Sequence, residues 1–326
     1  MDREAFLKSV DPGRASNPRN AGLPLGRAAT ATESQSPASS ADLVERAFAI
    51  LDECTGPNGP GQAPLGLEVA PRPVPNFEAP RPAAPGSLVP KPDLELQRRV
   101  LSDGTECPLP IRYFDVQCLI ATYLTGPDRA AELLGGSGLQ AVLQEDGKAV
   151  VQLYCIEYRK TDIGPYNEVG LTVLAQAPGD PAPANFVVDL PVTTAAANRA
   201  GREIWGYNKF VASIKVEKRG KAFSTVLSDA QNGLIGTFEG IRGPSVPAPP
   251  EDILTFTIHQ GRLVKTVIRV LTPFQASRGD GFVFKIGTSS HPMTNHLRTA
   301  EIEGAQPVLV HYADPFQSLL FPGRTL

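Results

Sequence analysis

Lys209 has the surroundings in this sequence that best favour covalent chemistry. In the stretch GREIWGYNKFV its neighbours Trp205, Tyr207, Phe210 and Val211 are aromatic or apolar. Withdrawal of an ammonium group from water favours the neutral amine, and a neutral amine is a nucleophile toward ketones. The stretch therefore indicates a lysine that forms an imine with a carbonyl substrate.

A second interpretation of the same stretch is a lysine at the edge of a strand. The aliphatic stem would then cover apolar surface while the charge stayed in water. The composition of the stretch alone fits both interpretations.

Other patterns of chemical interest are incomplete. His291 and His296 lie five residues apart, but no cluster of Asp, Glu or Cys accompanies them, as a metal site would require. The glycine-rich run at 135–139 lacks the Lys-Ser/Thr pair of a phosphate-binding loop. The sequence has no G-x-S-x-G motif of a serine hydrolase. We expect neither a metal nor a cofactor.

Charge and hydropathy limit the partners. The 34 acidic and 31 basic residues give a formal net charge of -3, so no strong positive field would attract nucleic acid or anionic lipid. No run of about 18 apolar residues could span a bilayer. The opening MDREAFLKSV carries two acids and lacks a long apolar run, so it does not resemble a secretory signal. We expect a cytoplasmic protein with no nucleic-acid partner, no membrane partner and reduced cysteines.

The elements that must position Lys209 are short strands. After residue 111, ten runs of β-branched and aromatic residues are separated by Gly, Pro, Asn and Asp. One convincing helix interrupts them, PDRAAELL, with Pro127 as its first residue and Gly135 just past its end. The pattern predicts an antiparallel barrel or sandwich.

The amino-terminal part has a different composition. Residues 1–92 are rich in Pro, Ser and Ala, with eleven prolines between 57 and 92. This composition predicts a flexible extension that contains a short amphipathic helix near 41–53. We therefore expect two parts, the extension at 1–92 and a β-rich domain at 93–326.

Three segments resemble the acetoacetate decarboxylase family. GREIWGYNKF resembles the Gly-Arg-Glu signature, whose first lysine forms the Schiff base and falls on Lys209. DIGPYNEVG resembles the Gly-x-Tyr-x-Glu stretch and puts the active-site acid on Glu168, while TYLTGPDRAAELL resembles an early strand and helix. The resemblance implies a cone-shaped antiparallel β-barrel, usually homo-oligomeric, with the lysine in a cavity and imine chemistry on keto acids.

The resemblance also implies roles for individual residues. Glu168 would exchange protons with the imine intermediates, although a surface carboxylate in a turn is the alternative for it. Arg202 and Glu203 would support the chain around the lysine through charge-assisted hydrogen bonds. The aromatic residues expected around the substrate are Tyr166, Tyr207 and Trp205.

The sequence departs from the family pattern beside the lysine and on one strand. Phe210 replaces a second lysine, Asn208 replaces a proline, and another acidic position falls on Leu153 or Tyr154. Successive side chains on a strand point to opposite faces, so residue 210 would point away from the amine at 209. Phe210 would then pack behind the cavity and help to exclude water.

Val116 stands where the family has an arginine near the substrate. A carboxylate in an apolar cavity needs a cationic or hydrogen-bonding partner. Arg112 or Arg159 would have to take this part at the substrate. Otherwise the substrate would lack a free carboxylate.

Three functions are compatible with these observations. The first is a Schiff-base-forming lyase that removes CO2 or a proton from a β-keto acid or related carbonyl compound. The second is an aldolase, dehydratase or cyclase of specialised metabolism that uses the same lysine. The third is a non-catalytic ligand-binding or scaffolding barrel. Only the two enzymes need a neutral, buried Lys209 and a small-molecule carbonyl substrate.

Overall fold

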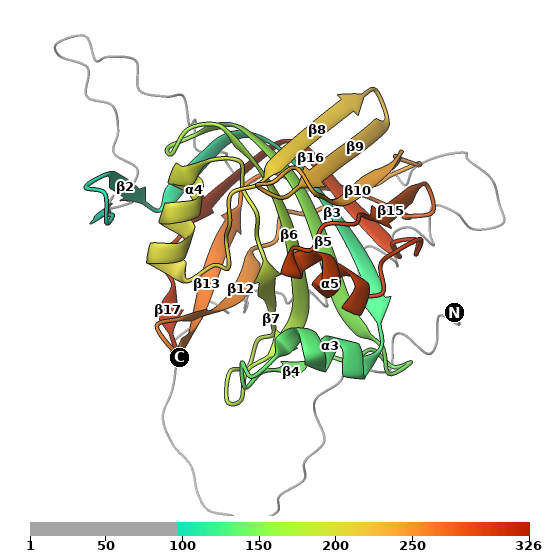
Figure 1. Cartoon of the computed structure of the whole chain (residues 1–326), viewed down its shortest axis with the longest axis horizontal. Coiled ribbons are helices and arrows are strands. Elements are labelled where there is room, and N and C mark those ends of the chain that lie inside the picture. Colours follow the sequence, from blue (N-terminus) through green and yellow to red (C-terminus); the bar gives the residue numbers. More distant parts are fainter. Residues whose placement is uncertain (1–96) are drawn as a thin grey trace, which may run out of the picture.

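In the part of the chain that the structure describes, residues 97–326 of a computed structural model, seven strands close into a barrel (Figure 1). The predicted extension at 1–92 and its helix near 41–53 lie outside the described residues. In spatial order the barrel strands are β16 (Leu309–Leu320), β3 (Ile111–Thr125), β5 (Ala149–Thr161), β6 (Tyr166–Gln176), β7 (Ala184–Asp189), β12 (Ile253–His259) and β13 (Arg262–Val270).

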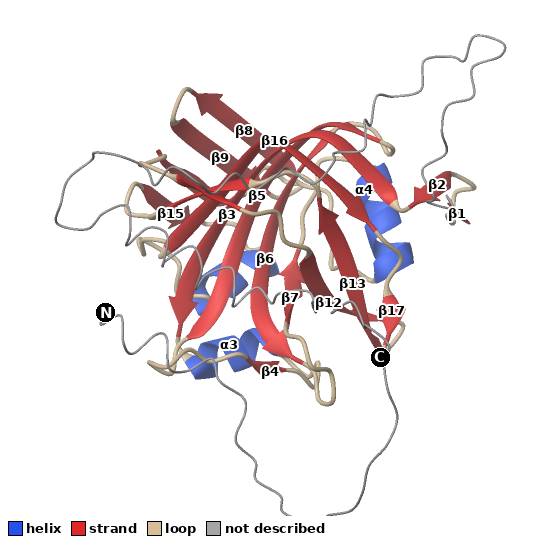
Figure 2. Cartoon of the chain, turned by 180° about the vertical axis from the view of Figure 1, so that it is seen from behind, coloured by secondary structure: helices blue, strands red, loops and turns tan. Residues whose placement is uncertain are grey.

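The pairing of β13 with β16 closes this barrel, with Ile268 opposite Leu320. Neighbouring barrel strands are antiparallel except β7 and β12, which pair in parallel. Figure 2 shows the long strands β3, β5 and β6 side by side from behind. The predicted mainly antiparallel β-barrel with few short helices is confirmed.

Alternation along the strands separates two apolar cores. Tyr154, Ile156 and Tyr158 of β5 belong to the core inside the barrel. The intervening Leu153 and Cys155 belong to a second core outside it. Because side chains alternate with a period of two, one strand can contribute to both cores.

A second, four-stranded sheet covers the outer core in the order β15, β10, β9, β8. Its strands are β8 (Ser213–Arg219), β9 (Ala222–Ser228), β10 (Leu234–Ile241) and β15 (Phe282–Ile286). The remaining short strands are β1 (Gln97–Val100), β2 (Glu106–Leu109), β4 (Gln140–Ala141), β11 (Val246–Ala248), β14 (Phe274–Ser277) and β17 (Arg324–Thr325).

The helices are short and lie against the barrel. They are α3 (Pro127–Leu134), α4 (Ala195–Ala200), the single π-turn η1 (Gly201–Trp205) that continues α4, and α5 (Pro292–Thr299). The predicted helix PDRAAELL is confirmed as α3, with Pro127 at its first position. No helix within residues 97–326 is long and apolar enough to cross a membrane.

Strand β10 was not expected from the sequence, because its glycines reduce the strand signal. A Cβ added at Gly236 would lie 2.5 Å from the Phe284 ring, and one at Gly240 would lie 2.3 Å from the carbonyl oxygen of Gly281. These glycines let β15 and its aromatic rings approach the backbone of β10. The loss of β propensity is therefore offset by packing.

Phe238 of β10 tests this outer core. Its ring is fully buried, with its centroid 5.2 Å from that of Phe282 and 6.3 Å from that of Phe223. We expect Phe238→Ala to lower the free energy of unfolding by about 3–5 kcal/mol, because it leaves a cavity. The exposed Ile241 on the same strand supplies the control, because Ile241→Ala should change the free energy of unfolding by less than about 0.5 kcal/mol. Urea denaturation measures both variants. Equal losses for the two variants would contradict the assigned core.

Candidate active site

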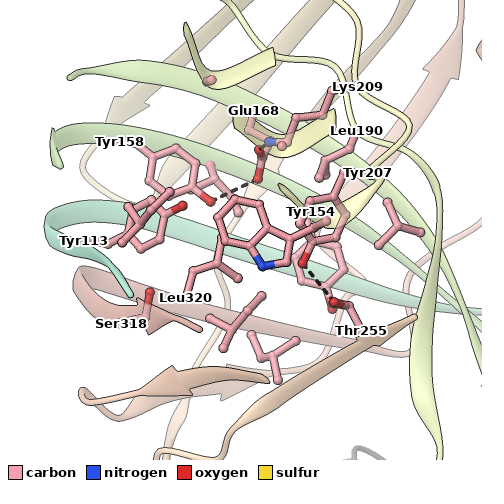
Figure 3. Close-up of a pocket in the computed structure, with 18 of the residues that line it drawn as sticks. Tyr113, Tyr154, Tyr158, Glu168, Leu190, Tyr207, Lys209, Thr255, Ser318 and Leu320 are labelled. Atoms are coloured by element: carbon pink, nitrogen blue, oxygen red, sulfur yellow. Dashed lines mark hydrogen bonds and ion pairs between the residues drawn. The ribbon is translucent and has the colours of Figure 1, made fainter. Parts of the chain in front are cut away.

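A cavity of about 80 Å³ lies in the lumen of the barrel. All seven barrel strands contribute to its lining, and α4 and η1 complete the wall. Figure 3 shows Lys209, Glu168 and several tyrosines around it. The lining is mostly aromatic and aliphatic, so a ligand inside would be largely removed from water.

Lys209 enters this cavity from an irregular segment, which corrects the expectation of a regular strand at this position. The segment pairs with residues 190–192: the amide of Leu190 donates to the carbonyl of Asn208 at 3.0 Å, and the amide of Val192 donates to that of Phe210 at 2.9 Å. Lys209 is 6% exposed and lines the cavity, whereas the adjacent Phe210 does not. The chain thus keeps the alternation of a strand without its full hydrogen-bond ladder.

Glycines make room for the lysine. A Cβ at Gly201 would lie 2.4 Å from both Cδ and Cε of Lys209, so the lysine stem occupies the space of a missing side chain. Gly206 ends η1 in the left-handed conformation, with φ of 71°, where a Cβ would lie 2.6 Å from the Cβ of His259. Arg202 donates from Nη1 to the carbonyl oxygen of Lys209 at 2.8 Å. The signature therefore fixes the backbone from which Lys209 projects.

Glu168 meets Lys209 inside the barrel. It lies on β6, is 5% exposed, and its Oε2 accepts a short hydrogen bond from Lys209 Nζ. Tyr158 donates to the other oxygen, Oε1, at 3.0 Å. The alternative of a carboxylate in a surface turn does not fit this position. An amine and a carboxyl group in direct contact can pass a proton between them without water.

Five tyrosines surround the pair: Tyr113, Tyr154, Tyr158, Tyr166 and Tyr207. Burial raises the pKa of each, and the nearby Glu168 adds to this effect for all of them except Tyr154. They are therefore neutral hydroxyl groups. The Tyr158 and Tyr166 rings stack at 4.2 Å, and Lys209 Nζ lies 5.7 Å from the centroid of Tyr166 and 5.8 Å from that of Tyr207.

Three of these tyrosines were not singled out as site residues from the sequence. For two of them the sequence signal was alternation: Tyr154, Ile156 and Tyr158 share one face of β5, and the structure pairs Ile156 with Glu168 on β6. Of the two positions considered for a further acid, Tyr154 lines the cavity and Leu153 packs in the outer core.

Trp205 and Tyr207 both line the cavity, as expected of substrate-contacting residues. The Trp205 indole donates from Nε1 to the carbonyl oxygen of Phe321 at 2.8 Å. The Tyr207 hydroxyl lies 2.9 Å from Oγ1 of Thr255. These contacts fix the two rings at the wall of the cavity.

Arg112 and Arg159 do not line the cavity, which corrects their expected place beside a substrate. The guanidinium of Arg112 forms a two-bond fork with Asp162, at 2.9 Å for each of the bonds from Nε and Nη2. Arg159 Nη2 bonds both Asp115, at 2.6 Å, and Asp314, at 2.5 Å. Carboxylates outside the cavity therefore already occupy both guanidinium groups.

The other predicted site residues also lie outside the lining. Val116 is fully buried on β3, opposite Tyr158 and Phe316, and its short side chain does not reach the cavity. Glu203 points to the outside and accepts hydrogen bonds from the amide and hydroxyl of Ser102.

Helix α5 and its N-cap residue pack against the lysine segment from outside the barrel. The Phe210 ring stacks on His291 with centroids 4.0 Å apart. Asn208 donates to Asp189 at 3.1 Å, and the other oxygen of Asp189 lies 2.6 Å from Nδ1 of His296. His291 thus packs directly against a neighbour of Lys209, and His296 is linked to the other neighbour, Asn208, through Asp189. Within residues 97–326, no three His, Cys, Asp or Glu side chains gather as metal ligands.

Comparisons with known proteins agree with this fold. A family model described as acetoacetate decarboxylase matches residues 101–259. A search of curated proteins found no match.

Several solved structures are similar to the chain. The acetoacetate decarboxylase from Legionella pneumophila subsp. pneumophila str. Philadelphia 1 shares 18% identity, with a TM-score of 0.51, over 73% of this chain and 92% of that one. The enduracididine biosynthesis enzyme MppR, complexed with pyruvate, shares 15% identity, with a TM-score of 0.51, over 67% and 90%. An acetoacetate decarboxylase-like enzyme from Sphingomonas wittichii RW1 shares 13% identity, with a TM-score of 0.50, over 66% and 92%. At these identities the likeness establishes the fold.

Gly201→Ala tests the packing of the lysine stem. The added Cβ would displace Cδ and Cε of Lys209, and a displacement of about 1 Å can slow a positioned reaction by about 100-fold. We expect a loss of this size in the rate of borohydride trapping of acetone on Lys209, with the fold retained by circular dichroism. Gly243→Ala is the control, because a Cβ there meets nothing within 4 Å. Unchanged trapping in Gly201→Ala would contradict the close packing.

His296 predicts a pH dependence of stability. Its hydrogen bond to Asp189 raises the pKa of His296, against the opposing effect of burial, and Glu132 adds a further attraction. The folded protein therefore holds this proton more tightly than the unfolded chain does. The stabilisation is complete below about pH 6.5 and is lost as pH rises through the folded pKa.

Urea unfolding of the wild type and His296→Gln between pH 6 and pH 9 measures this effect. The glutamine can still donate to Asp189 but does not titrate. We expect the wild type to lose stability relative to the variant as pH rises. Parallel profiles would show that the pair contributes nothing through proton binding.

Proposed function

Because the chain belongs to the acetoacetate decarboxylase family, we propose that it is an enzyme that forms an imine between Lys209 and a small carbonyl substrate. The observation that supports this proposal is the contact of Lys209 with Glu168 inside an apolar cavity. No cofactor is needed for this chemistry, since the amine and the carboxyl group supply the nucleophile and the proton transfer.

The steps follow from these two groups. With the shared proton on Glu168, the lone pair of the Lys209 amine attacks the carbonyl carbon. Glu168 then donates the proton to the carbonyl oxygen and takes one from the nitrogen, giving a neutral carbinolamine. Glu168 returns this proton to the hydroxyl group, which leaves as water, and the products are the protonated imine and the Glu168 carboxylate. The protonated imine accepts the electron pair of a broken bond at the adjacent carbon, either to a carboxylate or to a proton.

Tyr158 would hold Glu168 during these transfers. Its hydroxyl donates to Oε1, so Oε2 remains turned toward Lys209. The neighbouring hydroxyls of Tyr113 and Tyr166 could donate hydrogen bonds to a substrate oxygen.

A non-catalytic barrel is less compatible with the buried pair. Replacement of a buried ion pair by apolar side chains is often neutral or stabilising. A binding or scaffolding barrel would not need a lysine and a glutamate in its lumen. The pair is therefore better explained by a reaction that uses it.

Two reaction types use the same imine. One is decarboxylation of a β-keto acid. The other is an aldol-type reaction, with dehydration or cyclisation, and the similar enzyme MppR has been solved with the condensation product of pyruvate and imidazole 4-carboxaldehyde. The expected cytoplasmic location and homo-oligomeric assembly belong to the same proposal, and size-exclusion chromatography would test the assembly.

Borohydride trapping tests the imine. At least one compound in a panel of 2-keto acids, 3-keto acids and simple ketones should leave a reduced adduct on Lys209, identified by peptide mass spectrometry. Lys209→Ala should give none, and Glu168→Gln should form the adduct about 100-fold more slowly, because general acid-base catalysis contributes about 10²–10⁴-fold. Lys215→Ala, at an exposed lysine of β8, is the matched control and should behave as the wild type. The absence of any adduct in folded wild-type protein would refute the proposal.

A further inference from the structure

The lining of the cavity carries no net charge. Among the described residues that line it, Lys209 is the only basic side chain and Glu168 is the only one with a carboxyl group. Burial raises the pKa of the five tyrosines and of Cys118, so these groups remain protonated. The amine and the carboxyl group balance each other, whichever of them holds the shared proton.

The nearby guanidinium groups do not change this balance. Arg112 is bound to Asp162, and Arg159 is bound to Asp115 and Asp314. Arg202 donates to the backbone oxygen of Lys209 from behind the lysine and does not line the cavity. No guanidinium in the described part of the chain therefore faces the lumen.

A substrate carboxylate would upset this balance. After condensation the protonated imine keeps one positive charge, while Glu168 and the substrate would supply two negative charges. A buried ion without a counter-charge is strongly unfavourable, and two carboxylates that share one site repel each other. The tyrosine hydroxyls can donate hydrogen bonds but cannot neutralise the second anion. A substrate without a carboxylate leaves the lumen neutral.

The size of the cavity sets a second limit. An engineered apolar cavity of about 150 Å³ binds benzene. The lumen, at about 80 Å³, is smaller than that cavity, which excludes ligands much larger than benzene. This size fits a carbonyl compound of a few carbon atoms.

We infer that the substrate is a small ketone or aldehyde without a carboxylate, and that it reacts by loss of a proton from the carbon beside the imine. This inference rests on the proposed imine chemistry. In this step the Glu168 carboxylate takes the α-proton, and the C–H electron pair forms the C=C bond of the enamine. The C=N π electrons return to nitrogen, so charge is conserved and no oxidant is needed. The enamine carbon is then a nucleophile toward a proton or a second carbonyl group.

Two isosteric pairs test the inference. Pentane-2,4-dione differs from acetoacetate, and butane-2,3-dione from pyruvate, by a methyl group in place of an ionised oxygen. The measured quantity is the concentration that gives half-maximal labelling of Lys209 under cyanoborohydride, read by peptide mass spectrometry. We expect each diketone to label at a concentration at least about 100-fold below that of its keto-acid partner. Wild type, but not Glu168→Gln, should also exchange the hydrogens of acetone in deuterium oxide.

Glu168→Gln separates charge from shape. The variant removes one negative charge, so the protonated imine could then balance a substrate carboxylate. The ratio of half-maximal labelling concentrations, keto acid over diketone, should fall by about tenfold or more. The reaction must be followed until labelling is complete, because the adducts form more slowly in this variant. An unchanged preference in this variant would show that charge does not set the selectivity and would overturn the inference.

The remaining outcomes are also distinct. If the keto acids label Lys209 as readily as the diketones do in the wild type, the inference is wrong and the imine chemistry stands. If none of the four compounds labels Lys209 in folded protein, the imine chemistry fails and the inference fails with it.

Discussion

Exclusion of water from the contact between Lys209 and Glu168 is the constraint on which the site depends. Two ionisable groups are stable in a barrel lumen only when they satisfy each other and when further hydrogen bonds remain available. Tyr158 provides one such bond, to the second carboxyl oxygen. The pairing of β13 with β16 removes the open edge through which water could reach the pair. Closure of the sheet is therefore a chemical requirement of the site as well as a feature of the fold.

The lysine itself is positioned by elements that lack regular strand structure. Its stem lies in the space left by Gly201, and Arg202 holds its carbonyl oxygen. On the outer side, Phe210 stacks on His291, which caps the N-terminus of α5. An extended segment with an incomplete ladder would be mobile alone, so these contacts replace the hydrogen bonds that a full strand would provide. The rigidity that the proposed imine chemistry requires comes from both sides of the segment.

The sequence was informative where the signal is local and periodic. Alternating apolar residues, separated by Gly, Pro, Asn and Asp, predicted most of the strands. Pro127 and Gly135 marked the ends of α3, and the spacing of the signature indicated Lys209. The prediction that Arg112 or Arg159 lies beside the substrate was wrong, because their ion-pair partners are distant in the sequence. Asp162 lies 50 residues from Arg112, and Asp314 lies 155 residues from Arg159. Helix α5 was missed because only Met293, Thr294 and Leu297 of its eight residues are buried. Pairings of this kind become visible only in the folded chain.

The departures from the family pattern have different consequences in three dimensions. Position 210 lies outside the lumen, so phenylalanine there removes no charge from the cavity. Position 116 lies opposite Tyr158 and Phe316, which both line the cavity, and a long cationic side chain from there would point toward the lumen. Valine at this position leaves the wall neutral and apolar. In the proposed imine chemistry, desolvation in this wall favours the neutral amine, and the same lack of positive charge disfavours an anionic substrate. Under this proposal, nucleophile activation and substrate selection have one physical origin, the uncharged and apolar wall of the lumen.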